Sequence, residues 1–262
     1  MDRRKTGRRT ESVMKTIGIV AEGPRDFELI SAVIDTITNQ ENNYQLIQPE
    51  PDAAGNFGNG WKGVWKWCES NQGKLKTYMN ALTPTLDLLV VHMDGDVHRC
   101  EKEVHCKCQR MSCDMPEDTH PLMCERIISN KGNCPVSIPC ERHGSDPNSG
   151  AEFLQEFLQQ LLLPEDGLAV SYVIPYDATD TWIVAAYDEY DDYEMLHDPW
   201  ESIIAKAPLY HGIKIRNRPN KARKTYAELT LSVCENWNKV TGKCPQAKKF
   251  DESVRRFLMP EA

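Results

Sequence analysis

Long apolar runs are absent from this sequence of 262 residues, and none approaches the ~20 residues that a membrane-spanning helix requires. The first 13 residues are basic and polar and lack the apolar segment of a secretory signal. The Gly-x4-Gly-Lys-Ser/Thr loop of Walker-type nucleotide hydrolases is also missing, which excludes that mechanism. We therefore expect a cytoplasmic protein with no membrane partner, in which residues 1–13 form a disordered basic extension.

Basic residues are missing from one part of the chain and concentrated in the next. Between Glu165 and Ala205 there are eleven Asp or Glu and no Lys or Arg, whereas residues 206–256 contain 13 Lys or Arg and 4 Asp or Glu. The net charge of -8 argues against a protein whose whole surface coats nucleic acid. A basic region beside an acidic one instead fits a site that holds metal on one side and a polyanion on the other. A solvated charge pattern with no partner is the alternative interpretation.

The order of the apolar segments predicts alternating strands and helices. Short apolar runs are typical of buried strands, and apolar residues that recur every three or four positions are typical of helices. The predicted strands are residues 16–21, 44–47, 86–91 and 168–174. One predicted helix begins at Pro24. Further helices are predicted at residues 64–82, 149–163 and 178–190 and over most of the basic C-terminal part. This alternation predicts an α/β fold, with a parallel sheet and helices on both of its faces.

The stretch TLDLLVVHMDGDVH, residues 85–98, organises the rest of the chain. Its continuously apolar run, residues 86–91, is typical of a strand buried on both faces of a parallel sheet. Asp94 and Asp96 follow that run, and two carboxylates at a strand end can share a hard cation such as Mg²⁺. The alternative interpretation is a plain turn, because Asp-Gly is a favoured turn pair.

Acidic residues follow three of the predicted strands. Glu22 follows the first strand, Asp94 and Asp96 the third, and Asp177 and Asp180 the fourth. The carboxyl ends of parallel strands meet at one edge of the sheet, where open α/β sheets bind their ligands. The sequence therefore predicts an acidic ligand site at that edge.

Four segments together resemble the Toprim family. The stretch IVAEGPRDFELI, which contains Glu22, resembles the Toprim glutamate motif, and Asp94-Gly95-Asp96 after LDLLVVHM resembles the Toprim Asp-x-Asp motif. The later segments IPYDATDTWIVAAY and RPNKARKTY resemble the tail of overcoming-lysogenization-defect nucleases and of small Toprim proteins encoded with anti-phage systems. The resemblance covers residues 14–97 and 165–230. It implies a Toprim/Rossmann-like sheet and a nuclease activity.

Phosphodiester cleavage gives the acidic residues distinct candidate roles. Two divalent ions, Mg²⁺ or Mn²⁺, can neutralise the phosphate, activate water and stabilise the leaving oxygen. Asp94 and Asp96 are assigned to one metal ion, with Glu22 bridging the ions or acting as general base. Asp26 and Asp180 would complete a second metal site. For both, an ordinary acid in the first turn of a helix is the alternative.

A lysine is expected to stabilise the charge that develops on the phosphate. In the relatives a lysine follows the acidic residue at the position of Asp180, and here Lys221 or Lys224 is the candidate. The sequence favours neither, and a solvated helix face is the alternative for each. His92 and His98 flank the aspartate pair, and both are left outside the catalytic set.

Cysteine is concentrated in one segment, since seven of the ten cysteines lie between Cys100 and Cys140. Without a secretory signal, such a cluster is more typical of a metal site than of disulfides. We therefore predict that residues 98–147 form an insertion held by Zn²⁺, with free or redox-active thiols as the alternative. The candidate zinc ligands are Cys100, Cys106, Cys108, Cys113, Cys124, Cys134, Cys140 and His143.

These observations lead to one functional hypothesis and two alternatives. The hypothesis is a Mg²⁺- or Mn²⁺-dependent endonuclease acting on nucleic acid, DNA rather than RNA, as an anti-phage effector controlled by a partner ATPase. Residues 14–97 and 148–262 would form the catalytic domain around the insertion. One alternative is primase-like nucleotidyl transfer, which uses the same kind of acidic edge. The other is a non-catalytic Toprim-like binding module.

Overall fold

The computed structural model describes residues 14–50, 57–99, 147–190, 193, 196–216 and 221–260. The expected basic extension at residues 1–13 lies outside this part of the chain, as do residues 100–146 of the predicted insertion. The candidate zinc ligands all belong to that second segment. The disorder of the extension and the zinc site therefore stay predictions.

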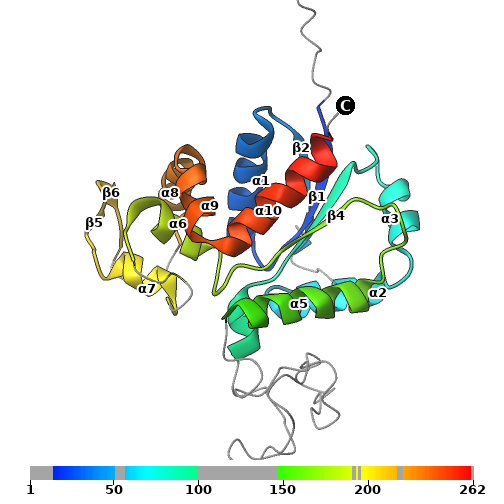
Figure 1. Ribbon diagram of the computed structural model, residues 1–262, viewed down its shortest axis with the longest axis horizontal. Helices are drawn as coiled ribbons and strands as arrows, with labels where there is room; N and C mark the ends of the chain where they lie inside the picture. The colour runs from blue at the N-terminus through cyan, green and yellow to red at the C-terminus, as the bar shows by residue number, and fades with distance from the viewer. Residues whose placement is uncertain are drawn as a thin grey trace, which may run out of the picture.

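A four-stranded parallel sheet forms the centre of the described structure (Figure 1). Strands β1 and β3 are buried along their whole length, as their apolar sequences TIGIV and LLVVH require. The order across the sheet is β2-β1-β3-β4, and each neighbouring pair is parallel. The strands are β1 (Thr16–Val20), β2 (Asn43–Gln48), β3 (Leu88–His92) and β4 (Val170–Val173). The prediction of an α/β fold with a parallel sheet is confirmed.

Alternate residues of the strands pack against two separate groups of helices, which lie on opposite sides of the sheet in Figure 1. Ile19 and Val90 face the first group, whereas Val20 and Val91 face the second. The first group comprises α1 (Pro24–Thr38), α6 (Asp180–Tyr187), α7 (Pro199–Ile204), α8 (Arg223–Glu235), α9 (Trp237–Lys243) and α10 (Pro245–Leu258). The second group comprises α2 (Trp61–Ser70), α3 (Leu75–Ala81) and α5 (Pro147–Leu162).

Two parts of the chain differ from the predicted elements. Residues 64–82, predicted as one helix, fall in α2 and α3, which are separated near Gly73. Gly73 has a φ of 63°, a left-handed conformation that glycine adopts readily and that commonly ends a helix. The basic C-terminal part contains a short hairpin, β5 (Leu209–Tyr210) and β6 (Ile213–Lys214), between its helices. Strands of two residues are too short to produce an alternating sequence pattern.

The connections reverse direction between β1 and β3, and this reversal locates the site. After β1 the chain passes through α1 to β2, and it then returns through α2 and α3 to β3 on the other side of β1. In open α/β sheets, ligands bind beyond the carboxyl ends of the strands where such a reversal occurs. Glu22 follows β1 and Asp94 follows β3, so both lie at this point.

Gly95 begins the short 3₁₀ helix η1 (Gly95–Arg99) and allows the end of β3 to lie against the segment that follows β4. A β-carbon at this position would collide with the carbonyl oxygens of Pro175 and Tyr176. These are backbone atoms and cannot rotate away. We expect Gly95→Ala to lower the free energy of unfolding in urea by about 1–3 kcal/mol, the usual cost of overpacking.

Gly242→Ala is the matched control, because a β-carbon there would have no neighbouring atom within 4 Å. Gly242 lies in α9, where alanine is a better helix former than glycine by about 1 kcal/mol. We expect this variant to be as stable as the wild type or slightly more so. Equal stability of the two variants would show that the close approach at Gly95 has no energetic importance.

Candidate metal centre

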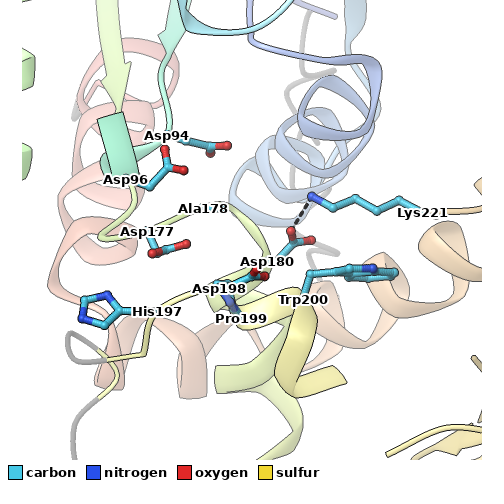
Figure 2. Close-up of a pocket in the computed structure, with 10 residues that line it drawn as sticks. All are labelled: Asp94, Asp96, Asp177, Ala178, Asp180, His197, Asp198, Pro199, Trp200 and Lys221. Atoms are coloured by element: carbon cyan, nitrogen blue, oxygen red, sulfur yellow. Dashed lines mark ion pairs between the residues drawn. The ribbon is translucent and has the colours of Figure 1, made fainter. Parts of the chain in front are cut away.

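Acidic side chains from two strand ends and one helix start gather at the carboxyl edge of the sheet. Asp94 and Asp96 follow β3, Asp177 follows β4, and Asp180 begins α6. With Lys221 they line a pocket of about 520 Å³, shown in Figure 2. The pocket lining consists of Asp94, Asp96, Asp177, Ala178, Asp180, His197, Asp198, Pro199, Trp200 and Lys221. The acidic positions that the sequence put at separate strand ends are therefore neighbours in space.

Glu22 joins the end of β1 to the end of β3. Its Oε1 accepts a hydrogen bond of 2.8 Å from the backbone N–H of Asp94. Burial raises the pKa of Glu22 well above its usual range, and the Asp94 carboxylate raises that pKa further. Glu22 is not among the described residues that line the pocket, and it contacts the site through Asp94.

Asp26 is a buried member of the site rather than a solvated acid at the start of a helix. It lies in the first turn of α1, and only 8% of its surface is exposed. Its Oδ1 accepts a hydrogen bond of 2.8 Å from the hydroxyl of Thr179, which precedes α6. Burial raises the pKa of Asp26, and the Asp94 carboxylate adds to this effect while His92 opposes it.

His92, which is not predicted as a catalytic residue, lies among these carboxylates. It is the last residue of β3 and is fully buried. Its Nε2 is 3.1 Å from Asp94 Oδ1, but the two atoms are not aligned for a hydrogen bond. Burial by itself lowers the pKa of His92, yet Asp26, Asp94 and Glu22 together raise it to about 9. A protonated imidazole here neutralises part of the acidic charge, as a divalent cation bound there would.

Asp180 and Lys221 form an ion pair at the other side of the pocket, marked in Figure 2. Asp180 is almost fully buried, and burial raises its pKa to about 6 although Lys221 opposes this shift. The Lys221 ammonium also lies 5.7 Å from the ring centre of Trp200 and 5.9 Å from that of Tyr226. These contacts hold the lysine at the pocket through both charge and cation–π attraction.

The structure distinguishes between the two candidate lysines. Lys224 lies in α8, its surface is exposed, and it is not among the described residues that line the pocket. Lys221 lies just before α8 and faces Asp180. Three positions separate the lysine at the site from the solvated one, and α8 begins between them, at Arg223.

Four consecutive residues of the pocket lining, 197–200, are not predicted from the sequence. His197 and Asp198 lead into α7, and Pro199 and Trp200 are its first residues; this segment carries no strand or helix signal strong enough to locate it. Asp198 caps α7 by accepting a hydrogen bond of 3.1 Å from the backbone N–H of Glu201. The run of acidic residues without Lys or Arg was the one available sequence signal.

Many basic residues of the C-terminal part are paired with acids. Lys206 lies 2.7 Å from Asp188, and both Lys239 and Lys243 contact Glu189. These pairs join the basic region to the acidic one, so much of the uneven charge is neutralised within the fold. Among the described residues that line the pocket, Lys221 is the one basic side chain apart from His197.

The donor set at this edge fits a divalent cation. Asp26, His92 and Asp94 each offer a ligand atom, and the three atoms lie within 4.8 Å of one another. Within the described part of the chain, neither His92 nitrogen, Asp94 Oδ1 nor Asp180 Oδ1 has a hydrogen-bond partner, although all are buried. Buried polar atoms are normally satisfied, so the residues at this edge have polar atoms that a bound cation could contact.

No protein-family model, curated protein or solved structure matches this chain. The resemblance to Toprim nucleases consequently rests on the residues quoted from the sequence. In the described ranges, no helix combines the length and the apolar character needed to cross a membrane.

Proposed function

We propose that this protein is a divalent-cation-dependent nuclease that hydrolyses phosphodiester bonds by a two-metal carboxylate mechanism. The observation that carries the proposal is the charge of the pocket, in which five aspartates face one lysine. Such a pocket repels a phosphodiester by itself. Bound Mg²⁺ or Mn²⁺ would reverse that charge and would polarise the phosphate and a water molecule.

The carboxylates divide into two groups by position. Asp94 and Asp96 follow the same strand and would hold one cation between them. Asp26 and Asp180 approach from the starts of α1 and α6 and would serve the second cation. One oxygen of Asp180 is paired with Lys221, and the other is buried without an aligned hydrogen bond among the described residues. Asp180 could therefore bind a cation with one oxygen while it orients the lysine with the other.

Glu22 is the proposed general base. Its raised pKa makes the ionised carboxylate a stronger proton acceptor than an exposed glutamate. Its hydrogen bond from the Asp94 N–H fixes one oxygen and leaves the other for a proton or a cation. Lys221, held by Asp180 and by the faces of Trp200 and Tyr226, would stabilise the negative charge that develops on the phosphate.

Three further parts of the proposal depend on the sequence resemblance alone: the preference for DNA over RNA, the anti-phage role and the control by a partner ATPase. The Zn²⁺ in the insertion depends instead on the seven cysteines between Cys100 and Cys140. Zinc would hold that segment together by closing a tetrahedron of cysteine and histidine ligands, apart from the oxygen-rich site at the sheet edge.

Glu22→Gln tests the assignment of the base. We expect the cleavage rate to fall by about 10²- to 10⁴-fold, the usual contribution of a general acid or base. The glutamine oxygen can still accept the Asp94 N–H, so the melting temperature should change little. Glu165→Gln is the matched control, because Glu165 precedes β4 at the opposite edge of the sheet. This variant should cleave at the wild-type rate. Wild-type cleavage by Glu22→Gln would make Glu22 a turn residue.

The function itself is tested by incubating the purified full chain with single- and double-stranded DNA and RNA. Each substrate is offered with Mg²⁺, with Mn²⁺ or with EDTA, in the presence and absence of nucleoside triphosphates. We expect shortened strands in the presence of either cation without triphosphates. Strands extended only with triphosphates would support the primase-like alternative instead. Binding without any change in strand length would support the non-catalytic module.

A further inference from the structure

The histidine at the end of β3 interrupts an otherwise apolar row. Leu88 and Val90 point to the face of the sheet that α1 covers, and both are fully buried. Strand residues two apart share a face, so His92 continues this row toward α1, where Asp26 lies in the first turn. An imidazole in a fully buried row costs free energy unless its nitrogens find partners.

The surroundings of His92 supply charge but no well-aligned hydrogen bond. Its Nε2 makes an ion-pair contact of 3.1 Å with Asp94 Oδ1, and neither ring nitrogen has an aligned hydrogen-bond partner in the described part of the chain. The available Asp26 oxygen, His92 nitrogen and Asp94 oxygen lie mutually within 4.8 Å. Three such atoms around one point match a metal-ligand set better than a hydrogen-bond network.

We propose that His92 is itself a metal ligand, so that the cation held by Asp94 is also bound by an imidazole nitrogen and by Asp26, which would then bridge to the second cation served by Asp180. Imidazole suits Mn²⁺ and the later transition metals, whereas Mg²⁺ takes oxygen ligands almost exclusively. The site should therefore prefer Mn²⁺ over Mg²⁺. The inference rests on the proposed function, because it assumes that this acidic edge holds the cation used in cleavage.

Access to the cluster is through Asp94. Its side chain is 20% exposed and lines the pocket, whereas His92 is fully buried and Asp26 nearly so. A cation entering from the pocket would meet Asp94 first and would then be shared with the two buried groups. The competing role for His92 is a permanent counter-ion, an imidazolium that balances the carboxylates without ever binding metal.

Pulsed electron paramagnetic resonance of the full chain with one equivalent of Mn²⁺ separates these roles. A directly bound imidazole modulates the Mn²⁺ echo through its ¹⁴N nucleus, and labelling the protein with ¹⁵N-histidine shifts that modulation. We expect nitrogen modulation in the wild type and in His211→Gln, a matched control that removes a histidine outside the pocket lining, paired with Asp188. We expect it to disappear in His92→Gln, while Mn²⁺ still binds to the carboxylates.

The affinities provide a second readout. We expect His92→Gln to raise the dissociation constant of Mn²⁺ at least about tenfold, since even a group that only supports a ligand contributes that much. The dissociation constant of Mg²⁺ should change less. The preference of the site for Mn²⁺ over Mg²⁺ should therefore become smaller in this variant. His211→Gln should leave both constants unchanged.

Bound Mn²⁺ without nitrogen modulation in the wild type would overturn the inference, as would unchanged modulation in His92→Gln. The wild-type measurement with ¹⁵N-histidine decides the matter even where His92→Gln does not fold. If the protein cleaves nucleic acid but its bound Mn²⁺ shows only oxygen ligands, the inference about His92 is rejected and the proposed nuclease function stands. Nitrogen-bound Mn²⁺ in a protein that cleaves nothing would support the histidine ligand and reject the nuclease.

Discussion

Asp94→Asn is expected to lower the rate of cation-dependent cleavage by at least about 100-fold. Asp94 contributes to the site in more ways than its neighbours, because it lines the pocket, belongs to the Asp26–His92–Asp94 cluster and donates its N–H to Glu22. The substitution keeps the backbone and the size of the side chain but removes the negative charge that holds a cation. Metal-ion catalysis supplies several kcal/mol of transition-state stabilisation, and each 1.36 kcal/mol is about tenfold in rate.

The stability of Asp94→Asn should stay close to that of the wild type. Removing the carboxylate relieves repulsion with Glu22 and Asp26 but weakens the attraction to His92, so the two effects oppose each other. We expect the free energy of unfolding without metal to change by no more than about 1 kcal/mol. Urea denaturation measures this change, and initial rates on a labelled oligonucleotide measure the cleavage.

Asp87→Asn is the matched control, because Asp87 precedes the same strand at its opposite end. Its carboxylate accepts the backbone N–H of Thr16 at 2.8 Å, a hydrogen bond that an asparagine oxygen can keep. We expect this variant to cleave at the wild-type rate. Equal activity of Asp94→Asn and Asp87→Asn would contradict the assignment of the metal centre to the end of β3.

Lys221→Met is expected to reduce cleavage by about 10²- to 10³-fold, the range found when one electrostatic donor to a transition state is removed. Methionine preserves much of the apolar stem that lies against Trp200 and Tyr226, so the packing is largely retained. Asp180 would lose its cationic partner, and its pKa, already raised to about 6 by burial, would rise further. A protonated Asp180 should limit the loss of stability.

Lys224→Met is the matched control for Lys221→Met. The two lysines are three positions apart, and either fits the family pattern, but only Lys221 pairs with Asp180 among the described contacts. We expect Lys224→Met to change the cleavage rate by less than twofold. Comparable losses in the two variants would indicate a general effect on nucleic-acid binding rather than a role for Lys221 at the phosphate.

The sheet and its acidic edge could be predicted because their signals are local. The runs TIGIV and LLVVH are too short and too continuously apolar for surface helices, and each is followed by an acidic residue. Parallel strands bring their carboxyl ends to one edge, so the sequence predicts that Glu22, Asp94 and Asp180 lie close together. The same rule does not give the strand order, which decides that β1 and β3 are neighbours.

The role of His92 and the choice of lysine could not be predicted, because both depend on contacts between distant segments. A histidine in a buried strand is unremarkable until α1 places Asp26 beside it. The pairing of Lys221 with Asp180 spans 41 positions and depends on where α8 begins. The separation of α2 from α3 is a local event, but it follows from the left-handed backbone at Gly73, which apolar periodicity does not reveal.

The central claim is that the carboxyl edge of this sheet binds a divalent cation. Isothermal titration of Mn²⁺ into the wild type and into Asp94→Asn tests it most directly, since the measurement does not depend on finding a nucleic-acid substrate. We expect saturable binding to the wild type, displaced by excess Mg²⁺, and loss of that binding in Asp94→Asn. Superimposable isotherms for the two proteins would contradict the claim.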